Sequence, residues 1–165
     1  MKVVSDASPL IALARIDCLE LLPKLYGRVL IPTEVYSEVM VAGAGLPGAS
    51  QIARASWIEI AAVNDSAAVE EARLRTGLGA GEVSAIILAK EIAAELTLID
   101  ERRARRFAKE EGLEVIGCVG ILETLYRGDH LSDLRDAFVR LLDHEFRIDR
   151  RALNESLLRL NLPPL

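Results

Sequence analysis

Four acidic residues beside predicted strands are the side chains of this sequence best placed to do chemistry. Asp6 and Asp100 each come directly after a short apolar run, Glu38 lies one turn into the helix expected after the second strand, and Glu82 begins another expected helix. Carboxylate oxygens gathered at one point suit Mg²⁺ or Mn²⁺, which keep several waters and accept phosphate oxygens. The chemistry of such a site is phosphodiester hydrolysis, in which metal-activated water attacks phosphorus.

Each acid also has a purely structural explanation. Asp6 could cap the helix that follows it, and Asp100 could cap the next, arginine-rich helix. Glu82 in a first helical turn is favoured by the helix dipole, and Glu38 could be solvated on a helix face. Four such coincidences at one edge of a sheet are much less expected than any one alone, so the group favours a catalytic site.

The elements that must position these acids alternate between strand and helix. We expect strands at 2–5, 29–31, 57–60, 96–99 and 115–116, and helices near 9–14, 17–25, 33–39, 49–55, 66–77, 82–94, 102–111 and 119–126. Thr33 is the expected N-cap of its helix, and Gly79–Gly81 is an expected break. The alternation predicts βαβ units and a mainly parallel sheet. Ligands of such sheets bind beyond the carboxyl ends of the strands, where Asp6 and Asp100 would meet if the first and fourth strands are neighbours.

Length and composition predict a single domain over residues 1–165 with an aliphatic core. The chain is 51% hydrophobic but only 4% aromatic. No signal peptide or membrane span is visible, and Cys18 and Cys118 lie among apolar residues, which indicates buried free thiols and a cytoplasmic location. Two amphipathic helices are expected within 131–162, which could mediate oligomerisation or pack on their own domain.

The charge pattern is uneven. A formal net charge of −5 argues against a simple nucleic-acid coat protein but not against a nuclease, because a carboxylate site is itself negative. One tight cluster of arginines could steer RNA phosphates toward the acids: Arg102, Arg103, Arg105 and Arg106. The better-supported alternative is a solvated helix on which Glu101, Glu110 and Glu111 pair with these arginines.

Four segments in order resemble one family. They read V-V-S-D-A-S-P-L-I-A-L-A from Val3, I-P-T-E-V-Y-S-E-V from Ile31, L-G-A-G-E-V-S-A-I-I-L-A from Leu78, and L-T-L-I-D-E-R-R-A-R-R-F-A from Leu96. Together they resemble the PIN-domain family, and in particular a prokaryotic group of PIN-like proteins. The resemblance covers essentially the whole chain.

The resemblance implies a three-layer α/β sandwich around a five-stranded parallel sheet of order 3-2-1-4-5. It implies Mg²⁺ or Mn²⁺ held by Asp6, Glu38, Glu82 and Asp100, with the Ser8 hydroxyl near the metal. It further implies endonucleolytic cleavage of single-stranded RNA, a homodimer, and often a toxin role beside a small antitoxin protein.

The sequence departs from the family pattern at two places. Many active PIN nucleases have aspartate at the position of Glu82, and many have a further acid after the position of Asp100, where Glu101 is the candidate replacement. A PIN-like module that binds nucleic acid or protein without hydrolysis is therefore the main alternative. Three other folds are excluded by motifs that the sequence lacks at the first strand. These are the paired acids of a receiver domain, the D-x-D of a haloacid-type phosphohydrolase and the G-x-G-x-x-G of a dinucleotide-binding domain.

Overall fold

The chain forms a five-stranded, all-parallel sheet. The computed structural model describes residues 1–45, 48–144 and 146–165. The strand order is β3-β2-β1-β4-β5, and every neighbouring pair is parallel. The strands are β1 (Val3–Ser5), β2 (Val29–Pro32), β3 (Ile58–Ala61), β4 (Leu96–Leu98) and β5 (Val115–Ile116). The predicted strand order is thus confirmed, and each strand begins and ends within one residue of its expected limits.

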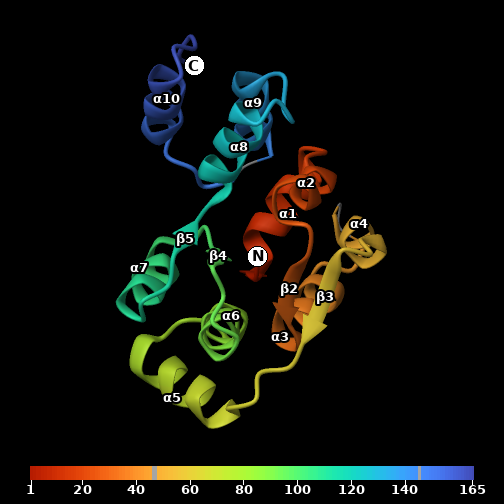
Figure 1. The fold of residues 1–165 in the computed structure, drawn as a ribbon, viewed down its shortest axis with the longest axis vertical. Coiled ribbons are helices and arrows are strands. Elements are labelled where there is room, and N and C mark those ends of the chain that lie inside the picture. Colours follow the sequence, from red (N-terminus) through yellow and green to blue (C-terminus); the bar gives the residue numbers. More distant parts are fainter. Residues whose placement is uncertain (46–47, 145) are drawn as a thin grey trace.

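Helices cover both faces of the sheet, which confirms the three-layer α/β architecture (Figure 1). A short 3₁₀ segment, η1, and a π-helical segment, η2, interrupt the series. The helical elements are α1 (Ala7–Arg15), η1 (Leu19–Leu21), α2 (Leu22–Tyr26), α3 (Thr33–Ser37), η2 (Glu38–Ala42), α4 (Ala49–Arg54), α5 (Ser66–Thr76), α6 (Ala80–Glu91), α7 (Arg102–Glu110), α8 (Cys118–Arg127), α9 (Leu134–Asp143) and α10 (Arg150–Arg159).

The centre of the sheet is buried on both faces, which explains its short aliphatic strands. One face packs against α1 and α8, and the core there continues without interruption into α9 and α10, where Phe138 is fully buried. The other face packs against α5, α6 and α7. In Figure 1, α8, α9 and α10 gather at the top, and α5, α6 and α7 lie in the lower half.

Strand order places the switch point of the sheet between β1 and β4. From β1 the chain proceeds outward through β2 and β3, and then returns to the other side of β1 as β4. The register aligns Ser5 with Leu98, and the Asp6 amide donates to the Leu98 carbonyl at 3.0 Å. The residues that follow these two strands therefore begin at the same edge of the sheet.

Several expected helix starts are wrong. Helix α1 begins at Ala7 rather than near Pro9, and the helix expected from Asp17 begins as η1 at Leu19 and continues as α2. Helix α6 begins at Ala80 and includes Gly81, because extended Gly79 is its N-cap residue and the Glu82 carboxylate accepts the Gly79 amide hydrogen. Helix α3 likewise begins one residue early, with Pro32 at the N-cap position and Thr33 already helical. Glycine in the first turn of α6 is explained by close packing, described below.

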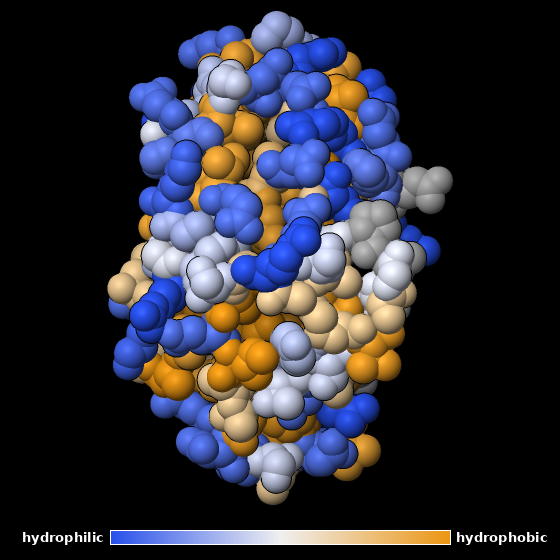
Figure 2. Space-filling model, turned by 90° about the vertical axis from the view of Figure 1, so that its right-hand side faces the viewer, coloured by the Kyte–Doolittle hydropathy of each residue, from blue (hydrophilic) through white to orange (hydrophobic). Residues whose placement is uncertain are grey.

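The surface mixes polar and apolar side chains. Figure 2 faces the side of the molecule where the edge strand β3 lies, and its upper half is predominantly hydrophilic, whereas apolar side chains are more frequent below. Ile60 of β3 is 51% exposed. Cys18 and Cys118 are buried free thiols, as expected. Across the described residues, no helix combines the length and apolarity needed to cross a bilayer.

Candidate metal centre

A pocket rich in carboxylates opens at the carboxyl edge of the sheet. Its volume is about 490 Å³, and the chain segments around it are the start of α1, α3 with η2, the start of α6, and the start of α7. Its lining residues are Asp6, Ser8, Glu34, Glu38, Gly79, Ala80, Gly81, Glu82 and Glu101. Five of these described lining residues are acidic and none is basic.

Asp6 is the most buried of these acids, with 3% of its surface exposed. It is the N-cap of α1, where its Oδ1 accepts the Ala7 amide hydrogen at 2.8 Å. The pKa of Asp6 is raised to about 7, chiefly by burial. The Ala7 hydrogen bond lowers this pKa, and the charges of Glu82, Glu38 and Asp100 contribute to raising it. Asp6 can therefore cap α1 and still be available to a ligand in the pocket. The charges of the neighbouring acids repel one another.

Glu38 reaches the same point from the other side of the pocket. It is the first residue of the π-helical segment η2, and such segments are frequent at functional sites. A Cβ atom added to Gly81 would collide with the Glu38 Oε2 atom and would lie 3.7 Å from Asp6 Oδ1. Gly81 therefore leaves the space in which these two carboxylates approach each other. Burial raises the pKa of Glu38.

Glu82 and Glu101 line the pocket while their oxygens accept backbone hydrogen bonds. Glu82 Oε1 accepts the Gly79 amide hydrogen at 3.1 Å. Glu101 caps α7, its two oxygens accepting from Arg103 and Ala104 at 3.0 and 2.8 Å. Burial raises the pKa of Glu82, the Gly79 hydrogen bond lowers it, and the charge of Glu101 raises it. Glu101, rather than Asp100, is thus the helix cap.

Asp100 lies beside this pocket but does not line it. Its Oδ1 accepts the Cys118 amide hydrogen at 2.7 Å, and its Oδ2 lies 3.0 Å from the Cys118 thiol sulfur. Burial, followed by the charge of Asp100, raises the pKa of Cys118 well above its ordinary value, so the thiol is neutral and donates. Asp100 and the Arg105 guanidinium also flank the same side of Gly117.

The donor set fits a hard divalent cation, although the described residues include no three acidic, histidine or cysteine side chains already in metal-ligand geometry. The pocket offers carboxylate oxygens, a serine hydroxyl and a glycine cradle. The pKa values of Asp6 and Glu82 are raised, first by burial and then by the charges of neighbouring acids. A cation would relieve that repulsion. Three acids could bind one ion only after their side chains rotate, and some of these side chains accept backbone hydrogen bonds. Those hydrogen bonds need not be lost, because each carboxylate oxygen has a second lone pair to offer.

Of the predicted metal ligands, the fold brings Asp6, Glu38 and Glu82 into one pocket, together with Ser8 and Glu101, and places Asp100 at its side. Sequence reasoning missed Glu34, which lines the same pocket. The i, i+4 spacing of Glu34 and Glu38 was a usable signal, because such residues share a helix face. It also missed the contact between Cys118 and Asp100, for which the sequence offers no local signal.

The predicted arginine cluster begins next to this pocket. Arg103 donates to the Thr76 carbonyl at 2.6 Å, and Arg106 lies 3.7 Å from Glu110. The expected pairing with Glu111 is not made, because Glu111 binds Arg75 and Lys90 instead. The cluster is therefore only partly neutralised by glutamates.

Comparison with known proteins agrees with this fold. No protein with a curated description matches the sequence. A family model does match, over residues 2–161, and its description is DUF3368: PIN domain. Because that match extends over nearly the whole chain, and the strand order is the one expected of the fold, the chain belongs to this PIN-domain family.

Proposed function

We propose that the chain is a metal-dependent endoribonuclease that hydrolyses phosphodiester bonds of single-stranded RNA. PIN domains are generally nucleases and usually use divalent metals, and this chain has the PIN fold. The observation that most supports the proposal is the pocket in which Asp6, Glu38 and Glu82 meet without a basic residue among the described lining side chains. A site built from acids alone is stable only if protons or a cation compensate the charge.

The ligands we propose for Mg²⁺ or Mn²⁺ are Asp6, Glu38, Glu82 and Asp100, assisted by Ser8 and Glu101. The cation would supply an activated water and would polarise the phosphoryl oxygens. The protein orients the donors: the start of α1 fixes Asp6 through the Ala7 amide, and the start of α8 fixes Asp100 through the Cys118 amide. Asp6 itself is almost fully buried.

The first test is cleavage of a labelled single-stranded RNA with Mn²⁺ or Mg²⁺, beside the same DNA sequence. We expect Asp6→Ala and Asp100→Ala to reduce the cleavage rate on the order of 10³-fold or more, as removal of central catalytic groups commonly does. Glu114→Gln is the matched control, because this exposed acid directly precedes β5 and so lies at the opposite edge of the sheet. A wild type that binds no divalent metal at millimolar concentration would refute the enzyme proposal.

A binding module without hydrolysis is the second candidate, and one observation favours it. Asp100 faces Cys118 and Gly117 rather than the pocket, so the site could lack one of its four acids. Mn²⁺ affinity measured for the wild type, Asp6→Asn and Asp100→Asn separates the two functions. If Asp6→Asn abolishes Mn²⁺ binding and Asp100→Asn leaves it unchanged, without cleavage by the wild type, the binding module is the better description.

The biological setting follows from the family resemblance alone. We propose a homodimer and a toxin role, with a small protein antitoxin as the partner. The molar mass in solution tests the first, and growth arrest on expression, relieved by co-expression of a neighbouring small reading frame, tests the second.

A further inference from the structure

A second pocket, with a volume of about 290 Å³, lies between α5 and α7. Three of its lining residues are arginines and one is an acid. The lining comprises Arg75, Thr76, Leu78, Arg103, Arg106, Phe107 and Glu110. The excess of positive charge is notable in a chain whose net charge is −5. Guanidinium groups gathered in this way suit an oxyanion, because each can donate two parallel hydrogen bonds.

Contacts with the surrounding helices hold two of the arginines in place. Arg103 donates to the Thr76 carbonyl at the end of α5. The Arg75 guanidinium lies over the Phe107 ring, 5.3 Å from its centre. A guanidinium held by such contacts loses less conformational entropy when a ligand binds, which favours affinity.

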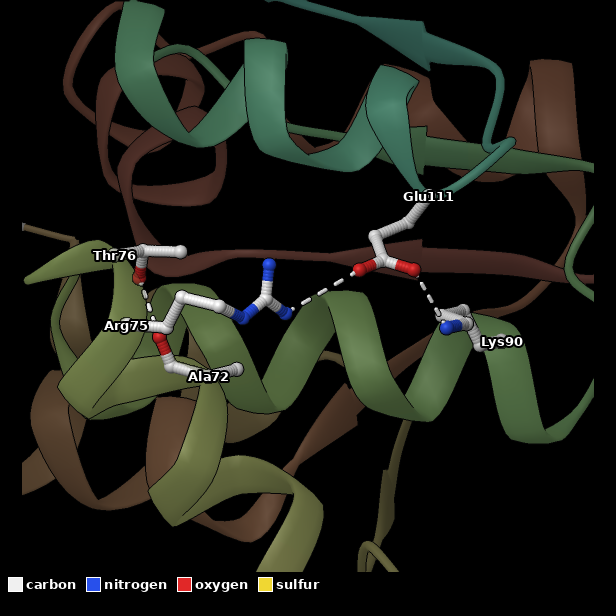
Figure 3. Close-up of polar contacts among 5 residues, drawn as sticks. All are labelled: Ala72, Arg75, Thr76, Lys90 and Glu111. Carbon is white, nitrogen blue, oxygen red and sulfur yellow. Dashed lines mark hydrogen bonds and ion pairs between the residues drawn. The ribbon is translucent and has the colours of Figure 1, made fainter.

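Glu111 holds Arg75, near the end of α5, by an ion pair, as Figure 3 shows. Its carboxylate lies 3.6 Å from Arg75 and 2.7 Å from Lys90, so it joins α5 and α6 to the end of α7. These cations lower the pKa of Glu111, with the Lys90 hydrogen bond as the largest cause. Because Glu111 is shared between two cations, the positive charge of Arg75 is only partly compensated.

The arginine pocket adjoins the carboxylate pocket through the chain itself. Leu78 lines the first and Gly79 the second, and Arg103 follows Glu101 by two residues at the start of α7. An extended, polyanionic strand passing over Leu78 and Gly79 would meet carboxylates on one side and guanidinium groups on the other. A phosphate bound to a metal ion would occupy the carboxylate pocket, and a phosphate without a metal ion would occupy the arginine pocket.

We infer that Arg75, Arg103 and Arg106 form a phosphate-binding site for the RNA strand, next to the phosphate held at the carboxylate pocket. That the ligand is RNA rests on the proposed function, whereas the preference for an oxyanion rests on the arginines of the pocket. The site fixes how the strand enters the carboxylate pocket and supplies affinity that the acids, which repel RNA, do not. Arg75 thereby joins the arginines of α7, and Arg102 and Arg105 lie outside the site.

The experiment measures binding without catalysis. A fluorescent single-stranded RNA of about ten nucleotides, within the span of usual single-strand sites, is titrated in EDTA and followed by anisotropy at several salt concentrations. Arg103→Gln and Arg106→Gln should each weaken binding about tenfold, the effect of one lost charge-assisted hydrogen bond. Each should also reduce the salt slope by about 0.7, the value for one phosphate contact on a single strand.

Arg102→Gln is the matched control, because it removes the same charge from the same helix at a residue that does not line the arginine pocket. Arg102 lines a neighbouring pocket with Arg105 and Lys109, to which Arg103 and Arg106 also contribute. Arg106→Gln also guards against misfolding, since the ion pair that Arg106 makes with Glu110 is long, at 3.7 Å, and exposed. Three results would each overturn the inference. They are equal losses of RNA affinity in Arg102→Gln and Arg106→Gln, unchanged RNA binding in both Arg103→Gln and Arg106→Gln, and no RNA binding by the wild type. A wild type that binds in the expected way but cleaves nothing with Mn²⁺ refutes the nuclease proposal and leaves this site standing.

Discussion

Asp6 stabilises the start of α1 and yet is costly to bury as a charged group. Its pKa is about 7 in the folded chain against an ordinary value of 3.8. Between these values the folded state binds more protons than the unfolded state, so folding stability falls as the pH rises from about 4 to about 7. The metal-free protein should therefore be less stable at pH 8 than at pH 5.

Asp6→Asn keeps an oxygen for the Ala7 amide but has no charge to bury, so it should raise the free energy of unfolding at pH 8 by a few kcal/mol. The gain should shrink toward pH 4, where the wild-type side chain is protonated. Urea denaturation in EDTA at both pH values measures this, with Glu114→Gln as an exposed control. Equal destabilisation at both pH values would mean that Asp6 is only a helix cap.

At the scale of elements, the close approach of α6 to α3 and η2 creates the centre of the pocket. Gly81 makes this approach possible, since a Cβ there would meet the end of the flexible Glu38 side chain and lie 3.5 Å from Val35. Alanine is the better helix former by about 1 kcal/mol. We therefore expect Gly81→Ala to keep or slightly raise thermal stability while displacing Glu38.

The same substitution should lower Mn²⁺ affinity about tenfold or more, the usual size of a disturbance next to a metal ligand. Calorimetric titration of Gly81→Ala, Glu38→Gln and the double variant with Mn²⁺ tests whether the effect passes through Glu38. If Gly81→Ala acts through Glu38, it adds little in the Glu38→Gln background. Additive losses of Mn²⁺ affinity in the double variant would contradict this explanation. So would a fall in the melting temperature of Gly81→Ala, because the loss of binding would then reflect a loss of stability.

At the scale of the whole molecule, one apolar core joins the sheet to the C-terminal helices. Fully buried Phe138 of α9 belongs to the same cluster as Leu10 of α1 and Leu98 of β4. We propose that residues 1–165 form one domain, and expect α9 and α10 to unfold together with the sheet. Phe138→Ala should then lower the free energy of unfolding by about 3–5 kcal/mol.

The measurement is thermal unfolding followed by circular dichroism and by the fluorescence of Trp57, the sole tryptophan. Trp57 precedes β3 and donates to Glu20, far along the sequence from α9. Coincident transitions in the wild type, both shifted by Phe138→Ala, indicate a single cooperative unit. A shift confined to circular dichroism would make the C-terminal helices a separate unit.

The sequence by itself determined the order and type of most elements. Strand limits were within one residue because short aliphatic runs ended by Pro32, Asp6 or Asp100 are local signals. Gly77, with a φ of +72°, ends α5 as expected, because glycine adopts this conformation without strain. The positions of acids after strands were equally local, so Asp6, Glu38 and Glu82 could be proposed together before their proximity was known.

Only the tertiary structure decided how the side chains of the two pockets are oriented. Asp100 faces the Cys118 amide and thiol, which the start of α8 brings to it across 18 residues. Arg75 and Arg103 line the same pocket because of how α5 packs on α7. Helix caps and hydrophobic periods depend on neighbours in the chain, whereas the direction of a long charged side chain depends on which donors and charges other segments bring within reach.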